Sequence, residues 1–289
     1  MSESSDKLIN AIKDKGKTLE AEMSFFDHLE ALRWHLIRAS IAILVFTSVA
    51  FSYFDWLWEH VVMAPSRDSF WTARVMCNIG HWLHRDFCFS TIKVQLMNNQ
   101  MAGQFILQIN ASLLIGITLG VPYLLWEIWR FIKPALHEKE RKAATGFVFY
   151  ATFLFFLGIM FGYYVITPLS VHFLMGYTVS KDILNLPDID SYLSSVATLT
   201  LATGIVFELP ILVYILANLG VMTPKFMRAS RRYAVVIILV ISAVVTPTPD
   251  MLTMTVVSIP LFVLYEVSIV VAAMVEKRKI KKSEELMNS

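Results

Sequence analysis

Long apolar blocks constrain the fold of this chain more than any other feature of its sequence. A helix that crosses a bilayer core about 30 Å thick needs about 20 mostly apolar residues. Four blocks meet this requirement, at about 36–58, 105–129, 146–168 and 193–219, and a fifth block covers 233–274. The chain is 56% hydrophobic and 17% charged, against about 45–50% and about 25% in soluble domains. We therefore expect a membrane protein.

The last apolar block is interrupted by Thr246-Pro247-Thr248-Pro249-Asp250. It forms either one interrupted helix or two short helices. Prolines and an aspartate are costly against lipid, and each half of the block is only just long enough to cross. We expect two short spans joined by a tight turn, in which Pro247, Pro249 and Asp250 have a structural role. The predicted fold is an all-α membrane protein with six transmembrane helices.

Lys and Arg are concentrated in alternate loops. Of the 25 basic residues, 20 lie in the N-terminal segment, in the loops after the second and fourth spans, and in the C-terminal segment. The other loops hold Arg67, Arg74, Arg85, Lys93 and Lys181. Because cytoplasmic loops carry the excess of Lys and Arg, both termini are expected in the cytoplasm, in agreement with six spans.

The chain divides by composition into three parts. Residues 1–23 form a polar cytoplasmic tail, which lacks the apolar core of a cleavable signal peptide. Residues 24–275 form the six-span membrane domain, with a long outer loop at about 63–104. Residues 276–289 form a basic cytoplasmic tail.

One glutamate lies in the middle of a predicted span. Glu208 belongs to the fourth span and is followed by Pro210, which frees a backbone carbonyl and predicts a kink. Ionisable side chains inside a membrane are costly and tend to mark function. A carboxyl group hydrogen-bonded inside the bundle is the structural alternative. Glu127 and Glu266 lie within reach of an interface and of water, and are less informative.

The outer loop holds the two cysteines of the chain. Cys77, His81, His84 and Cys88 recur at the spacing of one helical stripe. On a straight helix Cys77 and Cys88 lie about 16 Å apart, too far to share a metal ion, so a shared site requires a turn between them. Two cysteines in a loop on the oxidising side more often form a disulfide. We expect the disulfide and no metal site, with free thiols as a further alternative.

The sequence holds no spacing typical of catalysis. A zinc-protease helix, a serine nucleophile elbow and a phosphate-binding glycine loop are all missing from it. We therefore expect neither an enzyme nor a cofactor. A nucleic-acid partner is not expected either, because no basic surface stands apart from the apolar blocks.

Two segments on the predicted cytoplasmic side combine acidic and basic residues. One is Phe-Asp-His-Leu-Glu-Ala-Leu-Arg at 26–33, before the first span, and the other covers 129–141, after the second span. Interface side chains whose charges cancel explain most of this pattern. Alternatively, carboxylates beside Phe131 bind a basic, partly apolar peptide, because Arg–carboxylate pairs are geometrically selective.

At these residues the sequence resembles TatC, the multi-spanning core subunit of the twin-arginine protein translocase. The resemblance covers about residues 24–275. It rests on His-Leu-x-x-Leu-Arg at 28–33, Trp-x-Phe-Ile-x-Pro-Ala-Leu-x-x-x-Glu-Arg at 129–141, Ser-Tyr-Leu at 191–193, Phe-Glu-Leu-Pro at 207–210 and the doubled proline at 246–250.

The resemblance implies six helices in a cupped, concave arrangement with short fifth and sixth spans. It also implies a cytoplasmic site for signal peptides with paired arginines, to which Glu140, Phe131, Glu30 and Arg33 belong. Glu140 contacts the arginines and Phe131 shapes the pocket. Glu208, with Pro210, falls in the groove where single-span partner subunits of the TatA/TatB type dock, and Pro134 is structural.

The chain departs from the family pattern at three places. The family's acidic residue in the first motif falls on Ala31, whereas here Glu30 precedes it. That shift rotates the carboxylate by about 100° on a helix, which weakens the assignment of Glu30. The Asp-x-x-Ser-Gln sequence that often follows the doubled proline has Met254 in place of the amide. The outer loop is also longer than usual.

The resemblance implies a receptor and scaffold subunit that exports folded proteins across the cell inner membrane with the proton motive force. Its partners are single-span subunits, twin-arginine signal peptides, the bilayer and further copies of itself. A proton-coupled transporter of a small solute is the alternative, with Glu208 as a relay, although transporters commonly show paired broken helices. An intramembrane enzyme needs more polar residues than Gln108, Asn110 and Glu208.

Overall fold

The computed structural model describes residues 25–67, 70–83, 96–132, 146–178, 180, 186–218, 220–246 and 251–287. Within these ranges the chain is almost entirely helical, and β pairing is limited to an isolated bridge between Met97 and Asp188. The expectation of an all-α fold is confirmed.

The long helices follow one another with short elements between them. Helix α2 (Phe25–Ser52) leads to α3 (Phe54–Leu57), a π-helical turn (Trp58–Val62), a 3-10 turn (Ala64–Ser66) and α4 (Trp71–Leu83). Next come α5 (Gly103–Ile132), α7 (Phe147–Phe161), a π-helical turn (Gly162–Ile166), α8 (Thr167–Gly176), α9 (Ile189–Val206) and α10 (Leu209–Asn218). The last described helices are α11 (Pro224–Ala229), α12 (Arg231–Val245) and α13 (Met251–Met287).

By length and composition, five helical stretches of the described chain can cross a membrane. They are Glu30–Ser52, Gly103–Ile132, Val148–Gly176, Ile189–Asn218 and Thr253–Lys281. Helix α12 occupies the expected short fifth span and has 15 residues, or about 22 Å. The sixth helix is not short, because α13 has 37 residues and continues through the basic C-terminal segment. Lys and Glu are good helix formers, so the helix does not end with its apolar residues.

The fourth span is broken between α9 and α10. Phe207 and Glu208 form a turn, and Pro210 has no N–H to donate to the carbonyl of Val206. The N–H of Glu208 donates to the carbonyl of Ile205 at 3.1 Å. This bond joins residues three apart, as in a 3-10 helix, and so closes a tighter turn than that of an α-helix. The break lies at the place where the proline predicts a kink, and it contains Glu208.

Helices α2 and α5 pack closely because α5 carries two glycines four residues apart. A Cβ atom at Gly116 would lie 2.1 Å from Oγ1 of Thr47 and 2.7 Å from its backbone nitrogen. At Gly120 it would lie 2.6 Å from Cγ1 of Ile43. Small residues at this spacing let membrane helices approach each other. The first two spans therefore form one tightly packed pair.

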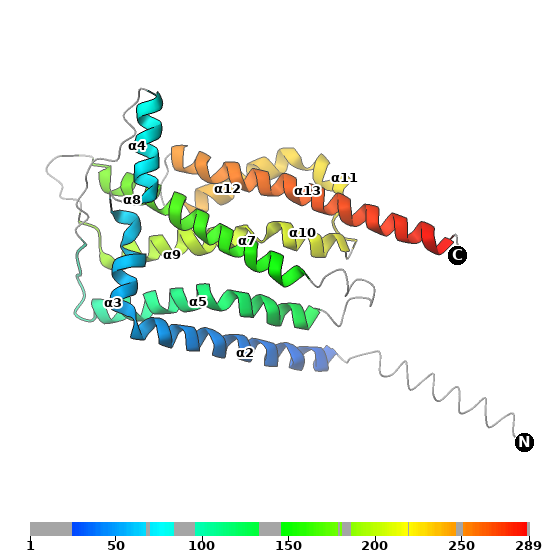
Figure 1. Ribbon diagram of the computed structural model, residues 1–289, viewed down its shortest axis with the longest axis horizontal. Helices are drawn as coiled ribbons and strands as arrows, with labels where there is room; N and C mark the ends of the chain where they lie inside the picture. The colour runs from blue at the N-terminus through cyan, green and yellow to red at the C-terminus, as the bar shows by residue number, and fades with distance from the viewer. Residues whose placement is uncertain are drawn as a thin grey trace, which may run out of the picture.

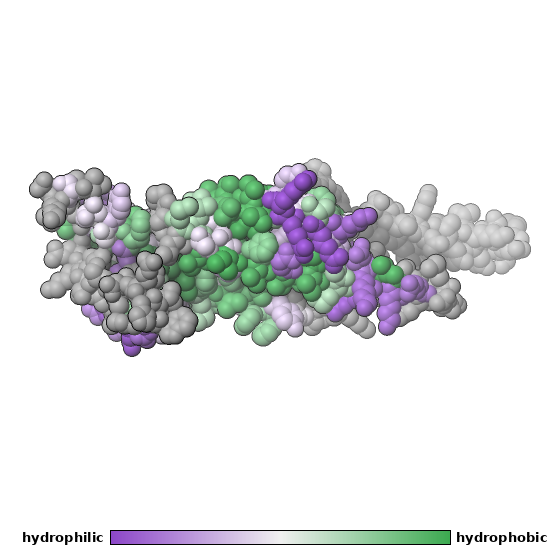
Figure 2. Space-filling model, turned by 90° about the horizontal axis from the view of Figure 1, so that it is seen from above, coloured by the Kyte–Doolittle hydropathy of each residue, from purple (hydrophilic) through white to green (hydrophobic). Residues whose placement is uncertain are grey.

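The long helices run side by side along the molecule (Figure 1). Helix α2 packs on α5, α7 on α9, and α13 on both α10 and α12. Helix α2 begins and α13 ends at the same end of the bundle, whereas α3 and α4 lie across the opposite end. Figure 2 shows apolar residues across the middle of one face and hydrophilic residues toward its ends. This distribution matches a protein that crosses a bilayer.

Tyr192, in the Ser-Tyr-Leu motif, and Tyr163 bind the π-helical turn Trp58–Val62, which follows α3. The Tyr192 hydroxyl donates to the carbonyl of Val62 at 2.8 Å, and the Tyr163 hydroxyl donates to the carbonyl of Val61 at 2.6 Å. Tyr192 is buried in a cluster with Leu107 and Val62. The π-helical turn after α3 is thus held against α5, α8 and α9.

Candidate functional site

A buried carboxylate lies near the end of the bundle at which α2 begins and α5 ends. Glu127 of α5 is five residues from the end of that helix and is 1% exposed. A carboxylate without water is costly unless other groups pair with it. The expectation that Glu127 reaches water at an interface is therefore wrong.

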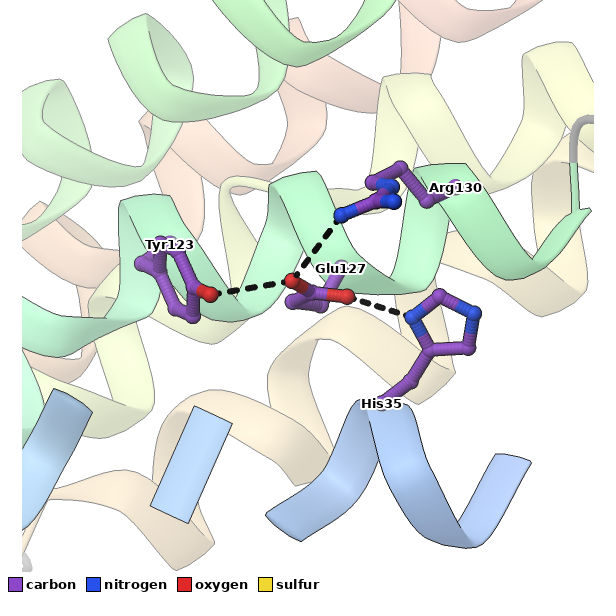
Figure 3. Close-up of polar contacts among 4 residues, drawn as sticks. All are labelled: His35, Tyr123, Glu127 and Arg130. Atoms are coloured by element: carbon purple, nitrogen blue, oxygen red, sulfur yellow. Dashed lines mark hydrogen bonds and ion pairs between the residues drawn. The ribbon is translucent and has the colours of Figure 1, made fainter. Parts of the chain in front are cut away.

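Three side chains surround Glu127 (Figure 3). Nδ1 of His35, on α2, forms a hydrogen bond with Oε2 of Glu127. The Tyr123 hydroxyl donates to Oε1 at 3.0 Å, and Nη1 of Arg130 lies 3.6 Å from the same oxygen. Tyr123, Glu127 and Arg130 share one face of α5 because they are four and three residues apart. We call these four residues the Glu127 cluster.

The Glu127 cluster touches the aromatic residue of the predicted peptide site. The rings of His35 and Phe131 meet edge to face, with centroids 6.1 Å apart. Phe131 is half-buried. The guanidinium of Arg130 lies 5.4 Å from the centre of the Trp126 ring. His35 thereby links the start of the first span to Phe131. The sequence predicted Phe131 in the peptide pocket but did not predict its contact with His35.

The sequence held part of the signal for this cluster. Tyr123, Glu127 and Arg130 recur at helical spacing and so form a polar stripe on an otherwise apolar helix. No local pattern identifies His35, because 92 residues separate it from Glu127. A histidine directly before a predicted span is the remaining hint.

The other predicted residues of the peptide site are only partly described. Glu30 and Arg33 are exposed on α2, and neither forms an ion pair with a described residue. Glu140 and Pro134 lie outside the described residues, which resume at Gly146. The roles of these four residues stay predictions.

The loop that contains Glu140 follows a buried anchor. Trp129 is buried and packs against Val148 of α7 and against Ile211, Tyr214 and Ile215 of α10. The tryptophan of the Trp-x-Phe-Ile motif thus joins three helices directly before the loop. Phe131, two residues later, is nearer the surface.

Glu208 lies in the broken fourth span without a complete set of partners. Its Oε1 atom is buried and accepts no hydrogen bond from a described residue. The neighbouring Phe207 stacks on Phe161 at 5.9 Å between ring centroids. Pro210, two residues after Glu208, is buried. The structural alternative, a carboxyl group hydrogen-bonded inside the bundle, therefore does not hold for Oε1 among the described residues.

The third glutamate of the spans has a structural partner. Oε2 of Glu266, on α13, lies 2.8 Å from Nη2 of Arg231 at the start of α12. Both side chains are partly exposed, so the pair stabilises the protein weakly. Glu266 thus joins the first turn of α12 to α13, nine residues before the end of the expected membrane domain at residue 275.

The remaining predicted residues lie in other parts of the chain. Cys77 lies on α4 and is disulfide-bonded, whereas Cys88, the only other cysteine of the sequence, lies outside the described residues. Pro247, Pro249 and Asp250 lie outside them too. Among the described residues, no three His, Cys, Asp or Glu side chains are placed to bind a metal ion.

Comparison with known proteins identifies similar sequences over most of the chain. Residues 27–260 match the family described as "Sec-independent protein translocase protein (TatC)". A protein of that name from Blattabacterium sp. subsp. Periplaneta americana is 33% identical over 266 residues, which cover 91% of this chain and 100% of the relative. Another from Deinococcus radiodurans is 34% identical over 252 residues, or 87% of this chain and 86% of the relative.

A solved structure has a similar fold. The crystal structure described as the twin arginine translocase receptor TatC superposes with a TM-score of 0.64 at 32% sequence identity. The match covers 86% of this chain and 99% of that chain. The family resemblance, the fold and the order of the motifs therefore agree.

Proposed function

Because the chain belongs to the TatC family of Sec-independent protein translocase proteins, we propose that it is the receptor and scaffold subunit of a twin-arginine translocase. It binds signal peptides with paired arginines and exports folded proteins with the proton motive force. The match over residues 27–260 carries this proposal, because it includes both the loop motif and the glutamate of the fourth span. The relatives named above are translocase proteins, and the small-solute transporter finds no support among them.

The peptide site lies at the end of the bundle where α2 begins and α13 ends. Glu140 binds the arginines, and Phe131 forms the apolar wall beside them. The contact between His35 and Phe131, together with the bond from His35 to Glu127, supports this assignment because it fixes the wall to both of the first two spans. Arg33 and the shifted Glu30 lie two and five residues before His35, on the approach to the same end.

Both termini lie in the cytoplasm, and the membrane is the cell inner membrane. The uneven distribution of Lys and Arg supports this orientation. The shared position of the start of α2 and the end of α13 is consistent with it.

Single-span partner subunits dock near Glu208. A buried carboxyl oxygen in a membrane span that accepts no hydrogen bond from a described residue supports a polar partner there, because such a group gains most from a hydrogen bond that another helix supplies. Pro210 keeps the span broken at this place, so that the backbone beside Glu208 is not a regular helix.

Binding of a signal peptide to the purified subunit tests the proposal. A peptide with Arg-Arg is expected to co-purify, whereas the same peptide with Lys-Lys is expected to bind more weakly. Glu140→Gln is expected to lower binding of the Arg-Arg peptide on the order of ten-fold, because one charged hydrogen-bond partner is lost. Glu138→Gln, two residues away in the same loop, is the matched control. Equal binding of the Arg-Arg and Lys-Lys peptides would contradict the receptor function.

A further inference from the structure

A groove opens between α7, α10 and α13. Its volume is about 540 Å³. Tyr150 and Leu154 line it from α7, Ile211 and Tyr214 from α10, and Val271 from α13. All three helices belong to candidate membrane spans. The groove therefore faces a region where the solvent is lipid.

The groove is as long as one leaflet of the membrane. On α13 its lining includes Val267, Val271, Met274 and Arg278, which share one helical face. From Val267 to Arg278 the helix rises about 16 Å, which is about half of a 30 Å hydrocarbon core. The groove thus runs from the middle of the membrane to the surface on the side of both termini.

Among the described residues that line the groove, only Arg278, at one end, is charged. Arg278 is exposed and forms no ion pair with a described residue. The next residue, Lys279, is already bound, because its Nζ donates to the carbonyls of Ala217 and Asn218 at 3.2 and 2.6 Å. The deep part of the groove is lined by aliphatic side chains such as Leu154. This is the polarity of a phospholipid, with a phosphate at the surface and a chain below it.

The length of the groove favours a lipid chain over a protein helix. A partner helix that crosses the membrane is about 30 Å long and would contact the bundle through both leaflets, whereas the groove spans one. A single acyl chain fits this limit.

We propose that this groove binds one acyl chain of an anionic phospholipid and that Arg278 binds the phosphate of its headgroup. A guanidinium binds phosphate through two hydrogen bonds, and basic pockets between membrane helices bind anionic headgroups. The bound lipid fills the space between α7, α10 and α13. Lipid binding of this kind does not require a signal peptide.

Lipid retention by the purified full chain tests the proposal. The protein is stripped of lipid in detergent and incubated with phosphatidylglycerol or with phosphatidylcholine of identical acyl chains, and retained lipid is counted by native mass spectrometry. The wild-type chain is expected to retain phosphatidylglycerol preferentially. Arg278→Gln is expected to weaken its retention roughly five-fold, the effect of one basic contact. Lys277→Gln, a neighbouring exposed cation outside the groove, is the control.

A second variant separates the groove from the charge. Val271→Trp fills the groove, and it is expected to lose both lipids while its thermal unfolding stays cooperative. Equal effects of Arg278→Gln and Lys277→Gln would show a general attraction to positive charge and overturn the proposal. Unchanged lipid retention by Val271→Trp would overturn it as well. If that variant instead lost a co-purifying single-span partner, the groove would belong to a protein helix.

Discussion

Glu127 illustrates how one acidic residue in a membrane helix can be both buried and structural. Its two carboxylate oxygens have partners from α5 and from α2. Removing one partner of a buried pair leaves the other without compensation. The pair between His35 and Glu127 is therefore expected to hold the first two spans together beside Phe131.

A double-mutant cycle measures this link. His35→Ala, Glu127→Ala and the double variant are compared with wild type in the thermal unfolding of the purified protein. Residues that share a buried hydrogen bond couple by about 0.5–3 kcal/mol, and we expect at least about 1 kcal/mol. The matched control is the cycle of Arg231→Ala and Glu266→Ala, whose partly exposed pair is expected to couple by less than about 1 kcal/mol. Additive effects of His35→Ala and Glu127→Ala would contradict a direct stabilising contact.

A second prediction concerns Oε1 of Glu208, which accepts no hydrogen bond from a described residue. Glu208→Ala is expected to reduce co-purification of single-span partner subunits, because it removes the acceptor that the partner's polar group reaches. Glu208→Gln keeps an acceptor oxygen and is expected to retain more of the partner. Both variants are expected to insert normally, since neither adds a charge. Full partner recovery with Glu208→Ala would place the docking site elsewhere.

At the scale of elements, packing between helices depends on backbone approach as much as on apolar area. Gly116 and Gly120 let α2 lie against α5 over the deep part of both spans. The Glu127 cluster joins the same two helices nearer the end of the bundle. The pair formed by α2 and α5 is thus fixed at two depths.

Gly116→Ala is expected to lower the midpoint of thermal unfolding, because the added Cβ would meet the backbone of Thr47 at 2.7 Å. Overpacking of this kind costs about 1–3 kcal/mol. Gly146→Ala is the control, because a Cβ there would meet only the Tyr150 ring, at 3.1 Å or more. Equal shifts for the two variants would show that α2 and α5 can separate without cost.

The elements also show what the sequence could predict. Span positions and the break at Pro210 follow from local properties, namely apolar length and the missing N–H of proline. The length of α13 does not, because Lys277 and its neighbours favour helix outside the membrane as well. The partner of Glu127 comes from 92 residues away, and no property of either segment alone encodes that contact. Glu140 was assigned by resemblance only, and its role, like that of the doubled proline, remains a prediction.

At the scale of the whole molecule, the distribution of Lys and Arg indicates the orientation in the membrane, and the apolar surface indicates which part of the bundle lies in the bilayer. The two terminal helices meet the same end of the bundle. Exposed Lys and Arg of α11, of the start of α12 and of the last part of α13 add to that end. The cross-lying α3 and α4 are at the opposite end, and Tyr163 and Tyr192 hold the π-helical turn that follows α3 against the bundle.

Thiol labelling in intact cells tests the orientation. Single cysteines at Ser5→Cys and Ser283→Cys, in a chain without its two natural cysteines, are expected to resist a membrane-impermeant reagent until the inner membrane is opened. A cysteine at Ser69 in the outer loop is expected to react at once in cells with a permeable outer envelope. Labelling of Ser5→Cys and Ser283→Cys on opposite sides would contradict an even number of spans.

The bond from Lys279 to the end of α10 has a consequence for biosynthesis. The carbonyls of Ala217 and Asn218 belong to the last turn of α10, and the donor that caps them lies about 60 residues later, on α13. A cation at this position also complements the negative end of the helix. While the ribosome is translating the residues between α10 and Lys279, the fourth span therefore lacks this cap, and only the arrival of α13 completes it.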